Sequence, residues 1–400
     1  MSRAERIESV TVRNLHFEYP PTGGYDYAGG HVTSRTTSLI TVTTASGLTG
    51  TGSAYSHPDL VKVIVDGHLA RHLQGEDATD IESLWRKMYE LTRWYGRKGA
   101  AMSTIGGIDI ALWDLRGKLA GEPLYRLLGG HDPCVRAYAS GLFWAPSTDQ
   151  LADEVAAARA EGFTTVKMRL GRDPDYDRGA VGVVRKALGE SGQILVDGSH
   201  RYDVGAARRL AEDLQPLGVG WFEEPFPPED IAGYVALRSN CALPLAAGEN
   251  EFGLQGFSEL ARAGAVDIMQ ADACRAGGIS EVMRVAHLAG SLGLRFAPHT
   301  WSDAVAITAN AHAVAAAPTG FTVEVDRTGN PFVDELLTEP LAVTDGRLRL
   351  SDRPGLGISV DEVTLARLAL TPGTGLPDGN YSDLVFGPEH AAAGAPQRRP

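Results

Sequence analysis

The chain has 400 residues and 43% hydrophobic content, which is enough to build one large domain or two smaller ones around packed cores. Its formal net charge of −13 excludes a general nucleic-acid or anionic-membrane surface, because such surfaces need basic patches. The sequence shows no signal-peptide pattern and no long apolar span, so we expect a cytoplasmic protein that is neither secreted nor inserted in a membrane.

The first 130 residues are expected to form an α+β capping domain. Residues 7–56 read as strand, loop, strand and strand, and the loop is the Gly- and Tyr-rich stretch PPTGGYDYAGGH. This stretch is too polar for a core and is of a kind that often carries specificity, although a plain connector is the alternative. Residues 59–119 show helical periodicity with a break near residues 96–99, and their last part, STIGGIDIALWDLRGKLA, indicates a packed helix.

Eight short apolar runs follow within residues 131–340, and helix-like runs separate them. The runs are VRAYAS, TTVKMRL, QILVDG, GWFEEP, LPLAAGE, VDIMQAD, LRFAPH and FTVEVD. Alternation of strand and helix patterns is typical of βα units with parallel strands. We therefore predict an α/β protein with a (β/α)7β TIM-like barrel and an N-terminal capping domain.

The last part of the chain has a different composition. Residues 341–370 read as short strands and turns that are expected to return to the capping domain. Residues 371–400 are rich in Pro, Gly and Ala, and this extension is expected to be partly disordered.

The three cysteines, Cys134, Cys241 and Cys274, fit neither a disulfide framework nor a CxxC metal motif. They are expected to be small core residues of a protein that works in a reducing compartment.

A chargeable residue recurs at the ends of successive apolar runs. From the third run onward these positions are 197, 223, 249, 272, 299 and 324, which lie 26, 26, 23, 27 and 25 residues apart. A barrel gathers the carboxyl ends of its parallel strands on one face, where active sites are built. Any one of these residues is explained equally well as a solvated strand end or an ion-pair partner, but all of them in register favour one shared pocket.

Asp197, Glu223 and Glu249 end three consecutive predicted strands, and all offer carboxylate oxygens. Without a cation, three converging carboxylates would repel and raise one another's pKa. A hard divalent ion removes that repulsion, and a few protein ligands with room for water and substrate suit Mg²⁺ best. Glu224 directly follows Glu223, so strand alternation turns it to the other side, where we expect a supporting or structural acid.

Lys167 and Arg169 are two residues apart on the second predicted strand, so both point inward if the strand persists. Asp272 and His299 end the sixth and seventh strands. A carboxylate held against a histidine raises the pKa of the imidazole and fixes its tautomer, which suits the ring to take or give a proton. The alternative for Asp272 is a cap on the helix that begins ACRAGGIS, and a lone histidine is more often structural.

Together with the segment AMSTIGGIDIALWDLRGK, the strand ends WFEEP and GEN and the run PHTW, these residues resemble the mandelate-racemase-like branch of the enolase superfamily. The resemblance covers nearly all of residues 1–365, and it depends on several motifs, because EEP alone would not be specific. It implies Mg²⁺ held by Asp197, Glu223 and Glu249. A small-molecule carboxylate substrate, such as a sugar acid, would bind that ion, so that its α-proton becomes acidic enough to remove.

The resemblance also implies roles for the other strand-end residues. His299, oriented by Asp272, is the expected base. Lys167 would help to neutralise the enolate, and Glu324 would hydrogen-bond a carboxylate oxygen from the opposite side. A homo-oligomer, from dimer to octamer, is implied as well.

The capping domain is implied to close the pocket and to select the substrate through residues 19–31 and 51–57. Some aromatic residues are expected to line the pocket wall, although each is explained equally well as a core residue: Tyr25, Tyr27, His57, Trp144 and Trp301.

Arg169 is a departure from the family pattern. Family racemases have Lys-x-Lys on the second strand, with the second lysine acting on the other face of the α-carbon, whereas arginine stays protonated near neutrality and is a poor base. This favours a one-base reaction, in which His299 takes the α-proton and a β-hydroxyl leaves. The proton for that hydroxyl would come from His299 after a syn elimination or from His200, for which a place in a polar surface turn is the alternative.

The first reading of the function is a Mg²⁺-dependent dehydratase of an aldonate or aldarate that gives a 2-keto-3-deoxy acid. The second is a cycloisomerase of a sugar-acid lactone, because the runs EVDRTGNPF and PGLGI resemble such enzymes. A racemase or epimerase of a hydroxy acid and a catalytically silent barrel that binds an acid sugar are the further alternatives.

Overall fold

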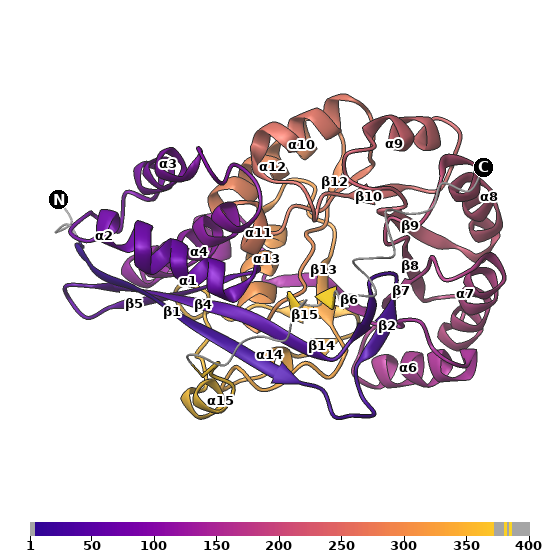
Figure 1. Cartoon of the computed structure of the whole chain (residues 1–400), viewed down its shortest axis with the longest axis horizontal. Coiled ribbons are helices and arrows are strands. Elements are labelled where there is room, and N and C mark those ends of the chain that lie inside the picture. The colour runs from indigo at the N-terminus through magenta and orange to yellow at the C-terminus, as the bar shows by residue number, and fades with distance from the viewer. Residues whose placement is uncertain (1–4, 372–379, 382–383, 386–400) are drawn as a thin grey trace.

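An antiparallel sheet and the helices packed on it form the N-terminal part of the molecule, to the left of the barrel in Figure 1. The computed structural model describes residues 5–371, 380–381 and 384–385. The sheet has the order β1-β4-β5, with β1 (Ile7–Glu18), β4 (Ser34–Thr44) and β5 (Thr49–Ala54). The helices are α1 (Pro58–Ile64), which continues through a π-helical turn (Val65–Leu69) into α2 (Ala70–Leu73), then α3 (Ile81–Thr92), α4 (Ala100–Ala120) and α5 (Leu124–Leu127).

The stretch PPTGGYDYAGGH is more ordered than its composition suggests. It contains a hairpin of β2 (Tyr25–Tyr27) and β3 (Gly30–Val32), and Tyr25 is buried, with its ring centroid 4.0 Å from that of Phe143. The expectation that this stretch stays outside the core was wrong for Tyr25, because a partner from the barrel covers its ring.

Helix α4 lies between the capping sheet and the barrel, which explains why its sequence contains two adjacent glycines. A Cβ added at Gly106 would lie 2.5 Å from the backbone oxygen of Ala273 in the barrel. A Cβ added at Gly107 would lie 2.7 Å from Cδ1 of Ile40 on the sheet side. Side chains at these positions would separate the helix from both neighbours, so glycine is required for the close approach.

Eight parallel strands form the barrel, with their helices outside them (Figure 1). The strands are β6 (Cys134–Ser140), β7 (Thr165–Arg169), β8 (Gln193–Asp197), β9 (Val219–Glu223), β10 (Leu245–Ala247), β11 (Ile268–Met269), β12 (Arg295–Phe296) and β13 (Val323–Asp326). Strand β13 pairs with β6, and a parallel bridge between Phe296 and Gly320 closes the circle. The predicted barrel with a capping domain is confirmed, although β10, β11 and β12 are shorter than the apolar runs.

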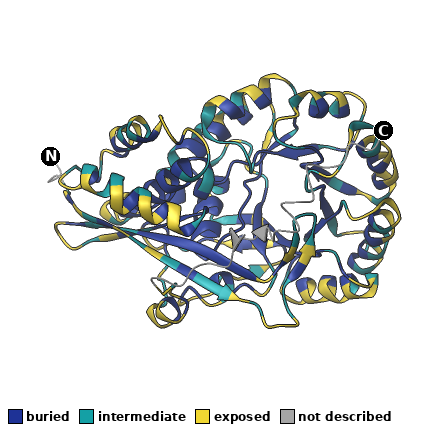
Figure 2. Ribbon diagram, in the orientation of Figure 1, coloured by how far each residue is buried: buried dark blue, intermediate teal, exposed yellow. Residues whose placement is uncertain are grey.

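The helices between the strands are α6 (Thr148–Ala160), α7 (Pro174–Leu188), α8 (Val204–Leu214) with a 3-10 turn (Gln215–Leu217), α9 (Ile231–Arg238), α10 (Gly253–Arg262), α11 (Ala273–Ala276), α12 (Gly278–Ser291) and α13 (Ala304–Ala316). Figure 2 shows that α6 to α10 bury their inner faces on the strands and expose their outer faces, whereas α13 is buried nearly throughout. Among the described residues, no helix is both long and apolar enough to span a bilayer.

Side chains fill the barrel beneath the strand ends, so it has a packed floor. They are Tyr138, Leu195, Trp221, Ala246, Ile268 and Ala297. Side chains two residues apart on a strand share a face, so the residue two positions later on each strand also points inward. On several of these strands that residue is polar.

After the barrel come α14 (Pro331–Asp334), β14 (Val343–Thr344), β15 (Arg347–Arg349) and α15 (Glu362–Arg367). Strand β15 pairs antiparallel with β6, and Leu370 N then donates to Asn14 O of the capping domain at 2.8 Å. Of the extension expected to be partly disordered, most lies outside the described residues, which include only residue 371 and the paired strands β16 (Asn380–Tyr381) and β17 (Leu384–Val385). The proposed domain limits stay predictions.

Candidate active site

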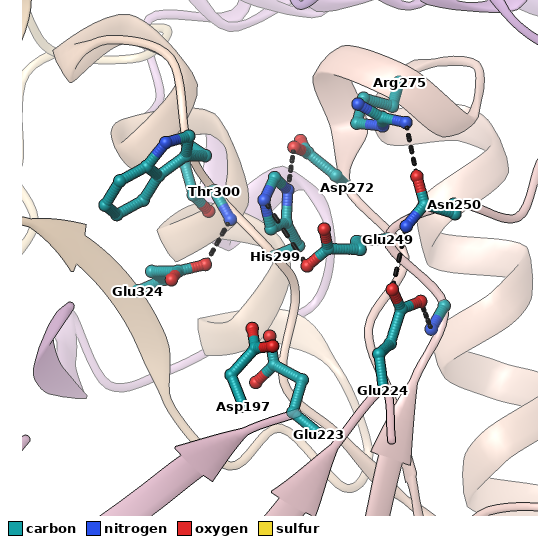
Figure 3. A network of polar contacts seen from close by, with 12 residues as sticks. Asp197, Glu223, Glu224, Glu249, Asn250, Asp272, Arg275, His299, Thr300 and Glu324 are labelled. Carbon is teal, nitrogen blue, oxygen red and sulfur yellow. Dashed lines mark hydrogen bonds and ion pairs between the residues drawn. The ribbon is translucent and has the colours of Figure 1, made fainter. Parts of the chain in front are cut away.

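Asp197, Glu223 and Glu249 converge at the C-terminal ends of three adjacent strands (Figure 3). Asp197 ends β8 and is the register partner of Glu223, which ends β9, while Glu249 follows β10. One carboxylate oxygen from each lies within 4.8 Å of the others. The predicted candidate ligands are therefore close enough to bind one metal ion.

The surroundings of these acids fit a divalent cation. Burial, together with the neighbouring carboxylates of Asp197 and Glu324, raises the pKa of Glu223 to about 8 against the opposing effect of Lys167. Burial also raises the pKa of Glu249, whose buried Oε2 has no hydrogen-bond partner. Crowded carboxylates with an unsatisfied buried oxygen are costly alone and are favourable around a hard cation.

Two cations on β7 face the acids. Lys167 is fully buried, and its Nζ lies 2.6 Å from Glu223 Oε1 and 2.8 Å from Glu324 Oε1. Arg169 Nη1 donates to Asp197 Oδ2 at 2.6 Å. Burial by itself would lower the pKa of both groups, but these ion pairs raise the pKa of each above its ordinary value. Both are therefore protonated in this arrangement, and arginine in particular is a poor base.

Two neighbouring aromatic rings, those of Phe143 and Trp301, lie against the guanidinium of Arg169. Its Cζ lies 5.3 Å from the ring centroid of Phe143 and 5.4 Å from that of Trp301. Cation–π contacts of this kind stabilise a charge away from water. Arg169 is thus a fixed positive group on the second strand.

Asp272 and His299 make the predicted pair, with 2.9 Å between Asp272 Oδ2 and His299 Nδ1. The other oxygen, Oδ1, accepts hydrogen bonds from Cys274 N at 2.8 Å and from Asn310 Nδ2 at 2.9 Å. Both interpretations of Asp272 are therefore realised at once, because one oxygen caps α11 while the other orients the imidazole. Nδ1 donates its proton to Asp272, which leaves Nε2 directed toward Glu249 Oε2 at 3.6 Å.

Charges around the imidazole determine its protonation. Burial would lower the pKa of His299, but the carboxylate of Glu249 and the hydrogen bond to Asp272 raise it to about 9. A cation held by Glu249 would offset part of that negative field and lower the pKa of His299 toward neutrality.

On the far side of Lys167, Glu324 Oε2 accepts from Thr300 N at 2.9 Å. Burial opposes the ionisation of Glu324, yet Lys167 and His299 lower its pKa to about 2.

His200 lies beside the acids, but one of its ring nitrogens is paired with another carboxylate. Its Nε2 pairs with Glu224 Oε2, and Glu224 is buried and turned away from its neighbour Glu223 (Figure 3). The supporting position expected for Glu224 agrees with this geometry. A role for His200 as the general acid stays a prediction.

The residues expected on the pocket wall differ in their surroundings. Tyr25 and Trp301 are buried in an aromatic cluster with Phe143. His57 instead begins α1, where its Nδ1 accepts a hydrogen bond from Asp59 N at 3.2 Å. Contact of these residues with substrate stays a prediction.

Sequence reasoning missed two capping residues that approach the site. The ring centroid of Tyr55 lies 6.0 Å from that of His299, and Tyr55 belongs to the stretch 51–57 that was expected to close the pocket. Arg35 on β4 is buried, and its Nη2 donates to the backbone oxygen of Trp301 at 2.6 Å. No motif in the sequence indicates this contact for Arg35.

Comparison with known proteins agrees with the geometry. Residues 150–364 match the family model described as enolase C-terminal domain-like, and residues 10–129 match the mandelate racemase / muconate lactonizing enzyme N-terminal domain. A D-galactarolactone cycloisomerase of Agrobacterium fabrum is 37% identical over 310 residues, which are 74% of this chain and 82% of that protein. An arabinonate dehydratase of Saccharolobus solfataricus is 35% identical over 324 residues, which are 80% of this chain and 87% of that protein.

A crystal structure of a racemase from Streptomyces coelicolor A3(2) with bound magnesium superposes with a TM-score of 0.84 at 32% identity. The match covers 91% of this chain and 100% of that one. Both family models and the similarity over most of the chain lead to one conclusion: this chain belongs to the enolase superfamily, in its mandelate racemase-like subgroup.

Proposed function

We propose that this protein is a Mg²⁺-dependent enzyme that removes the proton next to the carboxylate of a sugar acid and then eliminates the oxygen substituent at the β-carbon. The first candidate is a dehydratase of an aldonate or aldarate that produces a 2-keto-3-deoxy acid. The observation that supports it most is that the site combines one oriented imidazole, His299, with two cationic side chains, Lys167 and Arg169, that are held by ion pairs.

Asp197, Glu223 and Glu249 would hold the Mg²⁺. When bound, the ion supplies a Lewis acid for the substrate carboxylate, which lowers the pKa of the neighbouring C–H group. The unsatisfied Oε2 of Glu249 and the magnesium in the similar racemase structure support this assignment.

His299 would take the α-proton on Nε2, because its Nδ1 is committed to Asp272. Lys167 would stabilise the negative charge that develops on the substrate, since its ammonium already lies between Glu223 and Glu324. The bond to the β-oxygen then breaks, and the proton on Nε2 of His299 would pass to the leaving oxygen. The enol product tautomerises to the keto acid, and one molecule of water is lost.

His299 is the better supported donor of that proton, because Nε2 of His200 is paired with Glu224. A two-base racemase or epimerase is less well supported, since the second strand offers only cations as partners for the other face of the α-carbon.

A sugar-acid lactone cycloisomerase is the second candidate, favoured by the 37% identity to a D-galactarolactone cycloisomerase. The same base would act, and the same two bonds would break, namely the bond from the α-carbon to hydrogen and the bond from the β-carbon to its oxygen. If the β-oxygen belongs to a ring, its elimination opens the ring and the product is an isomer of the substrate. The two candidates therefore differ in where the leaving oxygen is attached.

A screen of aldonates, aldarates and their lactones with Mg²⁺ tests the proposal. We expect a 2-keto acid from at least one substrate. Mass spectrometry then distinguishes loss of water from isomerisation, and the product formed in D₂O should carry deuterium at the β-carbon. If no substrate reacts and no bound acid exchanges a proton with D₂O, the alternative of a silent acid-sugar-binding barrel is favoured. The cytoplasmic location and the homo-oligomer stay predictions.

A further inference from the structure

A second row of polar side chains lies beside the three acids, and Figure 3 shows three of its members, Glu224, Asn250 and Arg275, to the right of them. We call it the outer chain, and its members are His200, Glu224, Asn250 and Arg275. Asn250 is its central link, because Nδ2 donates to Glu224 Oε2 at 2.8 Å and Oδ1 accepts from Arg275 Nη2 at 3.0 Å. His200 pairs with the same oxygen of Glu224.

Each member of the outer chain closely follows a pocket residue in the sequence. The pairs are Asp197 and His200, Glu223 and Glu224, Glu249 and Asn250, and Asp272 and Arg275. A side chain that is held on the outside of a strand end fixes the backbone from which its neighbour projects inward. Residues that hold metal ligands in this indirect way commonly affect metal affinity.

The backbone at two members of the outer chain, one just past β9 and one in the loop after β8, has a conformation that residues other than glycine rarely adopt. His200 has φ of 60° and Glu224 has φ of 32°, and neither is glycine. Residues other than glycine adopt these angles only when surrounding contacts impose them. At Glu224 the side chain contacts His200 and Asn250 and accepts a hydrogen bond of 3.5 Å from Gly248 N. The backbone N of Glu224 also donates to Ala246 O at 3.0 Å, and its O accepts from His200 N at 2.9 Å.

The other end of the outer chain reaches the base and the capping domain. The guanidinium of Arg275 lies over the rings of Tyr55 and Phe252, at 5.2 and 5.7 Å from their centroids. Tyr55 in turn faces the ring of His299, and its backbone N donates to Cys274 O on α11 at 3.0 Å.

We infer that Asn250 and Arg275 are positioning residues, which set the place of the metal ligands relative to His299. The inference rests on the proposed use of Mg²⁺ by Asp197, Glu223 and Glu249. Both Asn250 contacts are specific for an amide, because one side of the group must donate to a carboxylate and the other must accept from a guanidinium.

Asn250→Ala removes both contacts, and Asn250→Asp places a second carboxylate against Glu224 while keeping a partner for Arg275. We expect both variants to bind Mg²⁺ about tenfold or more weakly than the wild type, as measured by calorimetry on the full chain without substrate. The matched control is Asn240→Ala, because Asn240 is exposed in the turn after α9 and its Nδ2 donates to Ala236 O in that helix.

The aspartate variant separates positioning from charge. If added charge alone mattered, Asn250→Asp would bind Mg²⁺ more tightly, and that result would overturn the inference, as would wild-type affinity in Asn250→Ala. If an Asn250 variant fails to fold, Arg275→Lys gives the same readout, since lysine keeps the charge but loses the planar contact to the amide and the rings. Combining Asn250→Ala with Arg275→Ala should weaken binding no more than the stronger single change does, because both act through one chain.

Wild-type protein that binds no Mg²⁺ would contradict the proposed function itself. Wild-type protein that binds Mg²⁺ with the same affinity as every outer-chain variant would contradict only the positioning inference.

Discussion

Arg35 on the capping strand β4 forms an ion pair with Asp326 at the end of the barrel strand β13, with 3.0 Å between Nη1 and Oδ2. Both side chains are buried, so the pair connects two domains away from water. Removal of one partner leaves the other charge buried, and we expect Arg35→Ala to lower the free energy of unfolding by about 3 kcal/mol. Urea unfolding measures the change. The control is Arg13→Ala, whose exposed ion pair with Glu362 should contribute about 1 kcal/mol or less.

His299→Asn removes the proposed base and keeps a side chain of similar polarity. We expect turnover of the sugar acid to fall by a factor of about 100 to 10,000 or more, while Mg²⁺ binding persists, because the imidazole is not among the candidate ligands. Rates of keto-acid formation and calorimetric binding test the two halves. Full activity of the variant would remove His299 from the mechanism, and His287→Asn on the exposed face of α12 should leave both quantities unchanged.

Glu249→Gln is expected to separate metal binding from the stability of the metal-free protein. In the wild type, Mg²⁺ at a concentration 100 times its Kd should raise the free energy of unfolding by about 2.7 kcal/mol, and the variant should lose most of this gain. Without Mg²⁺ the variant should be at least as stable as the wild type, because one of three repelling carboxylates is gone.

Thermal unfolding with EDTA and with Mg²⁺ compares the two proteins. Glu259→Gln, on the exposed side of α10, is the control and should respond to Mg²⁺ as the wild type does. An unchanged Mg²⁺ response in Glu249→Gln would contradict the assigned ligand set.

His312 on α13 is expected to make stability depend on pH. Its Nδ1 accepts from Tyr125 N at 2.9 Å and its Nε2 donates to Leu356 O at 3.1 Å, so the ring is neutral in the folded state. Burial lowers its pKa from 6.5 to about 4, against the smaller effect of the bond to Leu356. Above pH 6.5 the His312 imidazole is neutral in both the folded and the unfolded chain, so its full contribution to the free energy of unfolding is present. As the pH falls toward 4, the unfolded chain binds a proton that the folded one excludes, and about 3 kcal/mol is lost.

Urea unfolding at pH 7 and pH 4.5 measures this loss against His312→Gln, whose amide can replace both hydrogen bonds but does not titrate. The variant should lose less stability than the wild type over this interval. Equal losses would assign the pH dependence to other groups.

Gly106→Ala should destabilise the protein even though alanine favours helix. The added Cβ would lie 2.5 Å from the backbone oxygen of Ala273, so α4 and α11 must move apart. Gly179→Ala on α7 is the matched control, because no atom lies within 4 Å of its added Cβ, and it should gain about 0.5 to 1 kcal/mol. Chemical unfolding measures the change in the free energy of unfolding for both variants. An increase in both would show that α4 does not approach α11 tightly.

Chargeable residues at near-constant spacing at the ends of apolar runs predicted the barrel. Parallel strands place such residues on one face, and the residues found there are Asp197, Glu223, Glu249, Asp272 and His299. The sequence could not decide between two explanations of Asp272, since a carboxylate has two oxygens and both are used. Contacts such as that of Arg35 with Asp326 join residues far apart in the chain and follow no local pattern. The burial of Tyr25 escaped prediction for the same reason.

Because Asp272 has two roles, we expect the start of α11 to tolerate fewer mutations than the capping domain does. Because one carboxylate starts α11 and orients the imidazole, a mutation that remodels that helix start also disturbs proton transfer. The hairpin β2–β3 lies in the capping stretch that is expected to select the substrate, so we predict that mutations there change substrate choice more readily than the acid–base step. Evolution toward new substrates is therefore expected to act on the capping side, while the start of α11 stays constant.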